Sequence, residues 1–429
     1  MSIQPVLVWS LVATLAALCG TADAADETRY EFGGDIRTRG SIQTFPDNSI
    51  IQDFTGSSAT DLDSILRLKF KANRGSWDFK TDGQLIVSYG DTVKYTRELT
   101  EQAPGFEALF GRLQNDSRRW WDLTEVIEDD DKLAVIGRLD RLSVGYTSNT
   151  TAIRFGRQAL SWGNGLFYSP MDIVNPFDPT AVDTEYKAGD DMLYGQFLRA
   201  SGDDIQGSYV VRRDPITGEV ESDQATMAGK YHGFVGVSEY DVLVAQHYGE
   251  ALVAVGGSRD VGGAVWRTDL VLSDTETEDV VAQFVLNSSY SWIWGAKNIS
   301  GSVEYYFNGF GQRDGCYSPD CLADNPELVE RVARRQIFTL GRHYLGGSLM
   351  VEVTPLFTLT PNIFWNLGDN SALFQLVTQN SLGDNLLLLG ALGIPVGASG
   401  TEYGGIETGL PDSYFSSDLS VFLQLNWYF

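Results

Sequence analysis

The chain has 429 residues, 43% of them hydrophobic, and it carries 57 acidic against 31 basic side chains for a formal charge of −26. Its 10 Trp, 19 Tyr and 22 Phe exclude a disordered chain, and three Cys cannot hold a fold of this size together. The negative charge excludes a nucleic-acid binder, because a phosphate backbone would be repelled. What remains is a large folded chain, and β-barrels reach this length as a single domain.

Residues 1–24 are predicted to be a secretory signal peptide. An apolar run precedes Ala22 and Ala24, which stand at the small-residue positions of a cleavage site. The rest, residues 25–429, would then form one domain. Beyond the peptide no apolar run approaches the ~18 residues that a membrane-spanning helix needs. If the mature chain lies in a membrane, it must do so as a closed barrel.

Alternating strands follow from the start of the mature chain. In the first, Tyr30, Phe32 and Ile36 alternate with charged residues, the period-2 pattern of a two-faced sheet. An apolar face toward lipid and a polar face toward a wet interior require this pattern. We therefore expect an all-β fold, a transmembrane antiparallel up-and-down β-barrel of eighteen strands, with sixteen as the alternative. The predicted strands are 28–42, 62–73, 77–89, 132–147, 151–162, 191–200, 205–213, 224–233, 239–248, 251–258, 263–273, 280–292, 298–308, 334–353, 357–367, 372–380, 385–395 and 416–429.

Short and long connections alternate between these strands. This places the long ones at one end, as in outer-membrane barrels with short periplasmic turns and longer external loops. An even number of strands also returns both termini to the periplasmic side. The predicted long external loops are 43–61, 90–131, 163–190, 309–333 and 396–415.

The first strands place basic residues on the polar face. Two interpretations are open. The cations could pair with Glu31, Asp35, Asp78, Asp82 and Asp140 in a lattice that stiffens the wall, or they could form a field that guides anionic or polyhydroxylated solutes. The predicted pore-lining residues are Arg37, Arg39, Arg67, Lys69, Lys71, Lys80 and Arg154.

The connection 163–190 is predicted to be an ordered loop that folds inward. Three prolines, Pro170, Pro176 and Pro179, restrict its backbone. We expect it to lie opposite the basic residues and to narrow the lumen; the alternative is an external loop that packs on its neighbours. The acids predicted to form the constriction are Asp172, Asp178, Asp183, Glu185 and Asp190.

Later in the chain, GCYSPDC brings Cys316 and Cys321 close enough for a local disulfide in an oxidising compartment. The following PELVERVARR segment is predicted to be a short amphipathic helix. The final strand, DLSVFLQLNWYF, ends on Phe429, and a terminal aromatic on an alternating apolar face resembles the C-terminal signal of bacterial outer-membrane barrels. That resemblance implies recognition of Phe429 by the barrel assembly machinery.

Three further segments, IRFGRQALSWGNGLFYSPMDIVNPFDP, GRHYLGGSLMVEVTPLFTL and WNLGDNSALFQ, resemble proteobacterial outer-membrane porin-like proteins. Around GRQ the chain is distantly similar to the alginate-export porin family. The resemblance covers much of residues 150–395 and implies a β-barrel pore. The basic lumen of an alginate exporter is the feature that the predicted basic residues would imitate.

The function predicted from these features is an outer-membrane channel for small hydrophilic solutes, anionic or saccharide-like ones among them. The alternative is a non-conducting, plugged barrel that serves as a structural or docking component of an envelope complex. We expect no enzyme, because none of His232, His247 and His343 lies near a nucleophile motif. No catalytic residue, metal or cofactor is predicted. The expected partners are membrane lipid, lipopolysaccharide, and either a homotrimer or another envelope protein.

Overall fold

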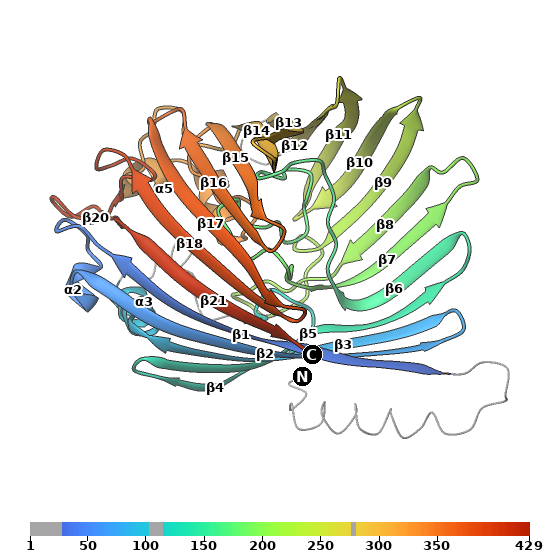
Figure 1. Ribbon diagram of the computed structural model, residues 1–429, viewed down its shortest axis with the longest axis horizontal. Coiled ribbons are helices and arrows are strands. Elements are labelled where there is room, and N and C mark those ends of the chain that lie inside the picture. Colours follow the sequence, from blue (N-terminus) through green and yellow to red (C-terminus); the bar gives the residue numbers. More distant parts are fainter. Residues whose placement is uncertain (1–27, 103–114, 276–279) are drawn as a thin grey trace.

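The computed structural model describes residues 28–102, 115–275 and 280–429, which form a closed antiparallel β-barrel of eighteen strands (Figure 1). The predicted signal peptide lies outside the described residues. The ring closes where β1 pairs with β21, and this confirms eighteen strands over sixteen. The barrel strands are β1 (Arg29–Thr44), β2 (Ser58–Arg74), β3 (Trp77–Gly90), β5 (Leu133–Thr147), β6 (Thr151–Gln158), β7 (Asp190–Leu198), β8 (Asp204–Val210), β9 (Thr226–Val235), β10 (Ser238–His247), β11 (Glu250–Val261), β12 (Ala264–Asp274), β13 (Val280–Trp294), β14 (Lys297–Asn308), β15 (His343–Thr354), β16 (Phe357–Asn366), β17 (Ser371–Gly383), β18 (Leu386–Val396) and β21 (Ser420–Tyr428).

The remaining elements lie in the connections between barrel strands. They are α2 (Gln52–Thr55), α3 (Asp91–Gln102), β4 (Thr124–Asp130), α5 (Pro319–Ala323), α6 (Pro326–Ala333), β19 (Ile406–Glu407) and β20 (Tyr414–Phe415). Strand β4 pairs with β5 alone, so it belongs to the sheet without being a member of the ring. Helix α6 is the predicted amphipathic helix, and its N-cap Asn325 accepts from the Leu328 amide. Across the described part of the chain, every helix is too short or too polar to cross a membrane.

Side chains along β21 show how alternation builds the wall. Leu423, Leu425 and Trp427 are 41–59% exposed on the outside, whereas Gln424 and Asn426 are 5% and 2% exposed on the inside. Lipid requires apolar side chains on the outside of a barrel. It also requires paired backbone groups, which a closed ring of strands provides. The fold is therefore that of a bacterial outer-membrane barrel.

The first and last strands of the barrel meet at this seam. The backbone amide of Gly34 donates to the Phe429 carbonyl at 2.9 Å, and the Phe429 amide donates back to Gly34 at 3.0 Å. A Cβ at residue 34 would lie 2.7 Å from the Phe429 ring and 2.4 Å from the Arg67 carbonyl oxygen. Only glycine leaves room there for the terminal aromatic ring to pack against β1.

The strands differ in length around the ring. Strands β1, β2, β3 and β5 have 14–17 residues, whereas β6, β7 and β8 have only 7–9. All the long connections, 45–57, 91–132, 159–189, 211–225, 309–342 and 397–419, leave the same end of the barrel. The connection 159–189 then turns inward, and Figure 1 shows its green trace inside the ring of strands.

One predicted strand was wrong over its first half. The strand predicted at 334–353 begins only at His343, because residues 334–342 form an irregular connection after α6. Ile337 and Leu340, two apolar residues of this stretch, pack with Phe310 and Leu328 in a small core of the connection itself. Their apolar faces are buried in a loop and not against lipid, a difference that periodicity cannot detect.

Candidate functional site

The basic residues predicted on the first strands lie on the inner wall, and all but Lys80 are paired with a described carboxylate. Lys69 contacts Asp35 at 3.1 Å, and Arg67 contacts Asp140 at 3.0 Å. All five acids of the predicted lattice have such a partner, so the lattice interpretation describes the geometry. The remaining pairs are Arg67–Asp82 at 3.6 Å, Lys71–Glu31 at 3.5 Å and Arg154–Asp78 at 3.4 Å.

The cations nevertheless differ in exposure. The side chains of Arg39, Lys69 and Lys71 are 44%, 33% and 37% exposed, whereas those of Arg37 and Arg67 are 8% and 4% exposed. Arg39 pairs with one carboxylate, Asp63, at 2.8 Å. Lys80 lies opposite Lys71 in the register of β2 and β3, and it has no ion pair with a described residue. The wall therefore combines buried, neutralised cations with accessible ones.

The tip of the connection 159–189 lies directly on this wall. Asp183 and Glu185 contact the two terminal nitrogens of Arg37 at 2.7 and 2.8 Å. The Tyr186 ring packs against three cations, with its centroid 4.3 Å from the Arg37 guanidinium, 3.8 Å from that of Arg67 and 4.4 Å from Lys69 Nζ. The expectation that the loop acids would face the basic residues from across the lumen was wrong, because ion pairs hold the tip against them.

Two side chains of β21 complete the contact between tip and wall. Gln424 donates to Asp183 at 2.7 Å, and the Tyr428 hydroxyl donates to Glu185 at 2.7 Å. Tyr186 also donates its hydroxyl to Asp35 on β1. The tip thus covers the region where the first and last strands of the barrel meet.

The other three predicted constriction acids lie elsewhere. Asp172 forms a buried pair with Lys187 inside the loop, with 2.6 Å between Oδ2 and Nζ. Burial raises the pKa of the Asp172 carboxyl to about 6, although Lys187 opposes the shift. Asp178 accepts from the Thr180 amide in a turn, and Asp190 is the first residue of β7, where it pairs with Arg212 at 2.8 Å. Asp172 and Asp178 thus stabilise the loop itself, whereas Asp190 belongs to the wall.

The first half of the loop is attached to the opposite wall by buried contacts. The Glu304 carboxylate of β14 accepts from the backbone amides of Leu166, Phe167 and Tyr168 at 2.5, 3.0 and 2.7 Å. A few residues earlier, Gly163 has φ +96°, a conformation that glycine favours, and its missing Cβ would lie 3.0 Å from an Asp269 oxygen. The loop can approach the wall this closely only with glycine there.

Apolar packing reinforces that attachment. The loop contributes Trp162, Met171, Ile173 and Val174 to a cluster with inward-facing residues of β7–β12. Met171 is fully buried. The wall contributes Met192, Val210, Ala228, Leu243, Leu252, Ala254 and Val271. Apolar side chains of the loop thus fill this side of the lumen.

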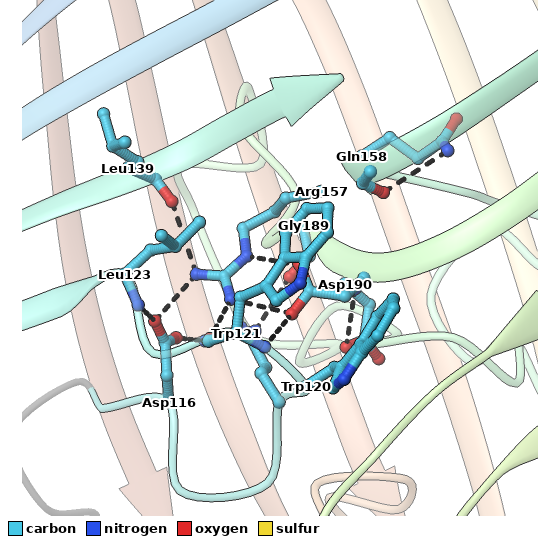
Figure 2. A network of polar contacts seen from close by, with 12 residues as sticks. Asp116, Trp120, Trp121, Leu123, Leu139, Arg157, Gln158, Gly189 and Asp190 are labelled. Carbon is cyan, nitrogen blue, oxygen red and sulfur yellow. Dashed lines mark hydrogen bonds and ion pairs between the residues drawn. The ribbon is translucent and has the colours of Figure 1, made fainter. Parts of the chain in front are cut away.

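A polar network centred on Arg157 lies at the end of β6, where the connection 159–189 begins (Figure 2). The fully buried guanidinium contacts Asp191 at 2.9 Å and Asp116 at 2.7 Å, and it donates to the backbone carbonyls of Leu139 and Trp121. Burial alone would raise the pKa of Asp116, but Arg157 and Arg119 lower it to about 2. No sequence pattern indicates this role of Arg157, although it lies in the GRQ motif that carries the family resemblance.

The outer connections pack over the lumen from the same end. Cys316 and Cys321 form the predicted disulfide in the connection 309–342, with Cα atoms 5.9 Å apart. Glu402 of the connection 397–419 joins this cap by accepting from the Leu340 amide at 2.9 Å and from the Tyr344 hydroxyl at 2.5 Å. Burial raises the pKa of Glu402 to about 7, against the effect of these hydrogen bonds.

A cavity of about 690 Å³ lies between α3 and the part of the wall formed by β1, β2, β3, β5 and β21. Its lining includes the exposed Arg39, which lies over the Phe422 ring at 5.6 Å, and the apolar Ile86 and Ile136. Arg39 is two residues along β1 from Arg37. The cavity therefore reaches the residue that follows Arg37 on the same face of β1, and it offers both charged and apolar surface.

The three histidines lie in the wall. His232 is 3.0 Å from Asp241, His247 is buried beside Thr226, and His343 contacts the Tyr305 hydroxyl. Within residues 28–102, 115–275 and 280–429, no group of three or more His, Cys, Asp or Glu could hold a metal ion.

Comparison with known proteins gives structural similarity only. No family model matches the sequence, and no curated protein matches it. OccAB4 of Acinetobacter baumannii is similar in structure with a TM-score of 0.52 at 7% identity, covering 93% of this chain and 98% of that one. A BenF-like porin of Pseudomonas fluorescens Pf-5 and OpdQ of Pseudomonas aeruginosa each give 0.50, at 9% and 8% identity, with the same coverage. The chain therefore has the fold of an outer-membrane porin.

Proposed function

We propose that the protein is a passive outer-membrane channel for small hydrophilic solutes, with a preference for anionic ones and room for saccharide-like ones. The observation that carries the proposal is the line of accessible cations Arg39, Lys69 and Lys71 on one inner wall. Cations inside a low-dielectric wall attract anions and repel cations. The 690 Å³ cavity beside them has the size of a small-solute site.

Orientation follows from the loop lengths. We place the long connections outside the cell and both termini in the periplasm, as in other barrels of this type. A solute would enter past α3, meet Arg39 and then pass the tip of the connection 159–189. Signal-peptide cleavage, trimer assembly, recognition of Phe429 by the assembly machinery and the likeness to alginate-export porins stay predictions.

The test is ion selectivity in planar bilayers. Replacing Arg39, Lys69 and Lys71 together by Gln should lower the permeability for chloride relative to potassium several-fold, seen as a shift of the reversal potential in a KCl gradient. A matched control is Lys297→Gln, at the β13–β14 turn and far from this wall. An unchanged reversal potential would show that these cations do not line the conducting path.

A non-conducting barrel is the second candidate. The apolar cluster around Met171 occupies part of the lumen, and Glu304 holds the loop there. Both observations favour a plugged barrel used for docking. This candidate predicts that the protein inserts into bilayers without conducting and that it copurifies with a stoichiometric envelope partner. Discrete conductance steps from the purified protein alone would exclude it.

A further inference from the structure

The loop tip neutralises the basic wall that the proposed function uses, and the inference below rests on that function. Among the described residues, the ion pairs that include the tip form one group of two cations, Arg37 and Lys69, and three carboxylates, Asp35, Asp183 and Glu185. Asp183 and Glu185 belong to the loop, so without its tip the wall keeps two cations against one carboxylate at this place.

The tip binds Arg37 as a solute would. Asp183 and Glu185 place one oxygen each on its two terminal nitrogens, the two donors that a carboxylate ligand engages. Tyr186 adds an aromatic ring beside the guanidinium at 4.3 Å. The side chain of Arg37 is left 8% exposed, so a solute cannot reach it while the tip is in place.

The attachment of the tip is of a kind that can be reversed. No backbone-to-backbone hydrogen bond joins residues 182–188 to any other described segment. The Lys187 carbonyl accepts from the Arg141 side chain of β5, whereas Asp183, Glu185 and Tyr186 contact the wall through their side chains. The side chains of Asp183 and Glu185 are 22% and 40% exposed, so these carboxylates can exchange their protein partner for solvent and salt ions.

We propose that residues 183–186 are a built-in surrogate ligand that occupies a carboxylate site on Arg37 until a carboxylate-bearing solute displaces it. Displacement removes the two loop carboxylates and leaves Arg37 and Lys69 with Asp35 alone, so anion preference is fully developed only when solute is present. The solute enters from the cavity beside Arg39, which is the nearest accessible cation on the same strand. The site is thus closed at rest and opened by its own substrate class.

Succinate is the probe, and the measurement is its dissociation constant by isothermal titration calorimetry on the full-length barrel in detergent at fixed ionic strength. In the variant Asp183→Asn/Glu185→Gln the competitor is removed, so the dissociation constant should fall about tenfold, which is ~1.4 kcal/mol. The matched control is Asp178→Asn, in an exposed turn of the same loop, and it should bind succinate like the wild type. An equal or weaker affinity in the double variant would overturn the proposal.

Two additions separate this inference from the proposed function. Adding Arg37→Met to the double variant should abolish the gain, whereas a gain that persists would place the anion elsewhere and overturn the assignment of Arg37. Hydrogen exchange of residues 182–188 should accelerate with succinate more than with KCl of equal ionic strength, and equal acceleration would also overturn it. Neither measurement requires conductance, so a silent barrel would contradict the channel alone.

Discussion

The connection 159–189 crosses the lumen and is attached to two walls by different physical means. Its first half is buried against β7–β14, where Glu304 accepts three backbone amides and Met171 is fully enclosed. Its tip lies on β1, β2 and β21 through the partly exposed Asp183 and Glu185. Buried amides and apolar side chains have no alternative partner, whereas exposed carboxylates can exchange theirs for solute or salt. The same loop is therefore fixed at one end and releasable at the other.

The largest effect should come from breaking the buried attachment. Glu304→Ala removes the acceptor of the Leu166, Phe167 and Tyr168 amides, at a cost of about 1–3 kcal/mol for the buried Tyr168 amide and less for the two part-buried ones. We expect the loop to leave the wall, seen as rapid proteolysis of residues 159–189 in an otherwise intact barrel.

Glu304→Gln is the matched control for this substitution. It keeps one carbonyl oxygen that accepts from the same amides, so the loop should stay largely protected from protease. If the alanine variant is as protease-resistant as the wild type, the first half of the loop is held by apolar packing alone.

A smaller effect is expected from breaking the buried ion pair between Asp116 and Arg157. The pKa of Asp116 is lowered from 3.8 to about 2, so the stability that this carboxylate contributes is present above pH 4 and is lost as the pH falls toward 2. The shift corresponds to about 2 kcal/mol. The free energy of unfolding in guanidinium should therefore fall less between pH 4 and pH 2 for Asp116→Asn than for the wild type.

The control for that comparison is Asp122→Asn. Asp122 lies six residues further along the same connection, and its side chain is exposed. This variant should lose stability on acidification to the same extent as the wild type. Identical pH profiles for the wild type and Asp116→Asn would mean that Asp116 is not the titrating group.

The same contrast separates what the sequence could predict from what it could not. Strand positions, the C-terminal strand and the inward cations followed from period-2 alternation, which is a local property. The partner of Glu304 could not be predicted, because the loop amides lie 136–138 residues away along the chain. Asp190 was assigned to the loop because its pairing with Arg212 depends on where β7 begins, and strand boundaries are the least certain part of such a prediction.

The alternation also gave no information on how far the tip would reach. Asp183 and Asp178 have the same chemistry and lie five residues apart, yet one pairs with Arg37 and the other accepts from Thr180 in a turn. What distinguishes them is the attachment of the first half of the loop, which fixes the distance that the remaining residues can span. Only the folded wall determines that distance.

The smallest and most selective effect should come from salt. Raising KCl from 0.1 to 1 M shortens the screening length from about 10 Å to about 3 Å, which weakens ion pairs in contact with solvent and leaves buried hydrogen bonds nearly unchanged. Hydrogen exchange of residues 182–188 should therefore accelerate a few-fold, consistent with less than about 1 kcal/mol for such contacts, while residues 166–168 keep their protection. In Asp183→Asn/Glu185→Gln the tip should exchange fast at both salt concentrations, because the contacts that salt screens are already absent. Acceleration of both segments together would mean that the loop moves as one body, and the distinction between its fixed and releasable ends would then be wrong.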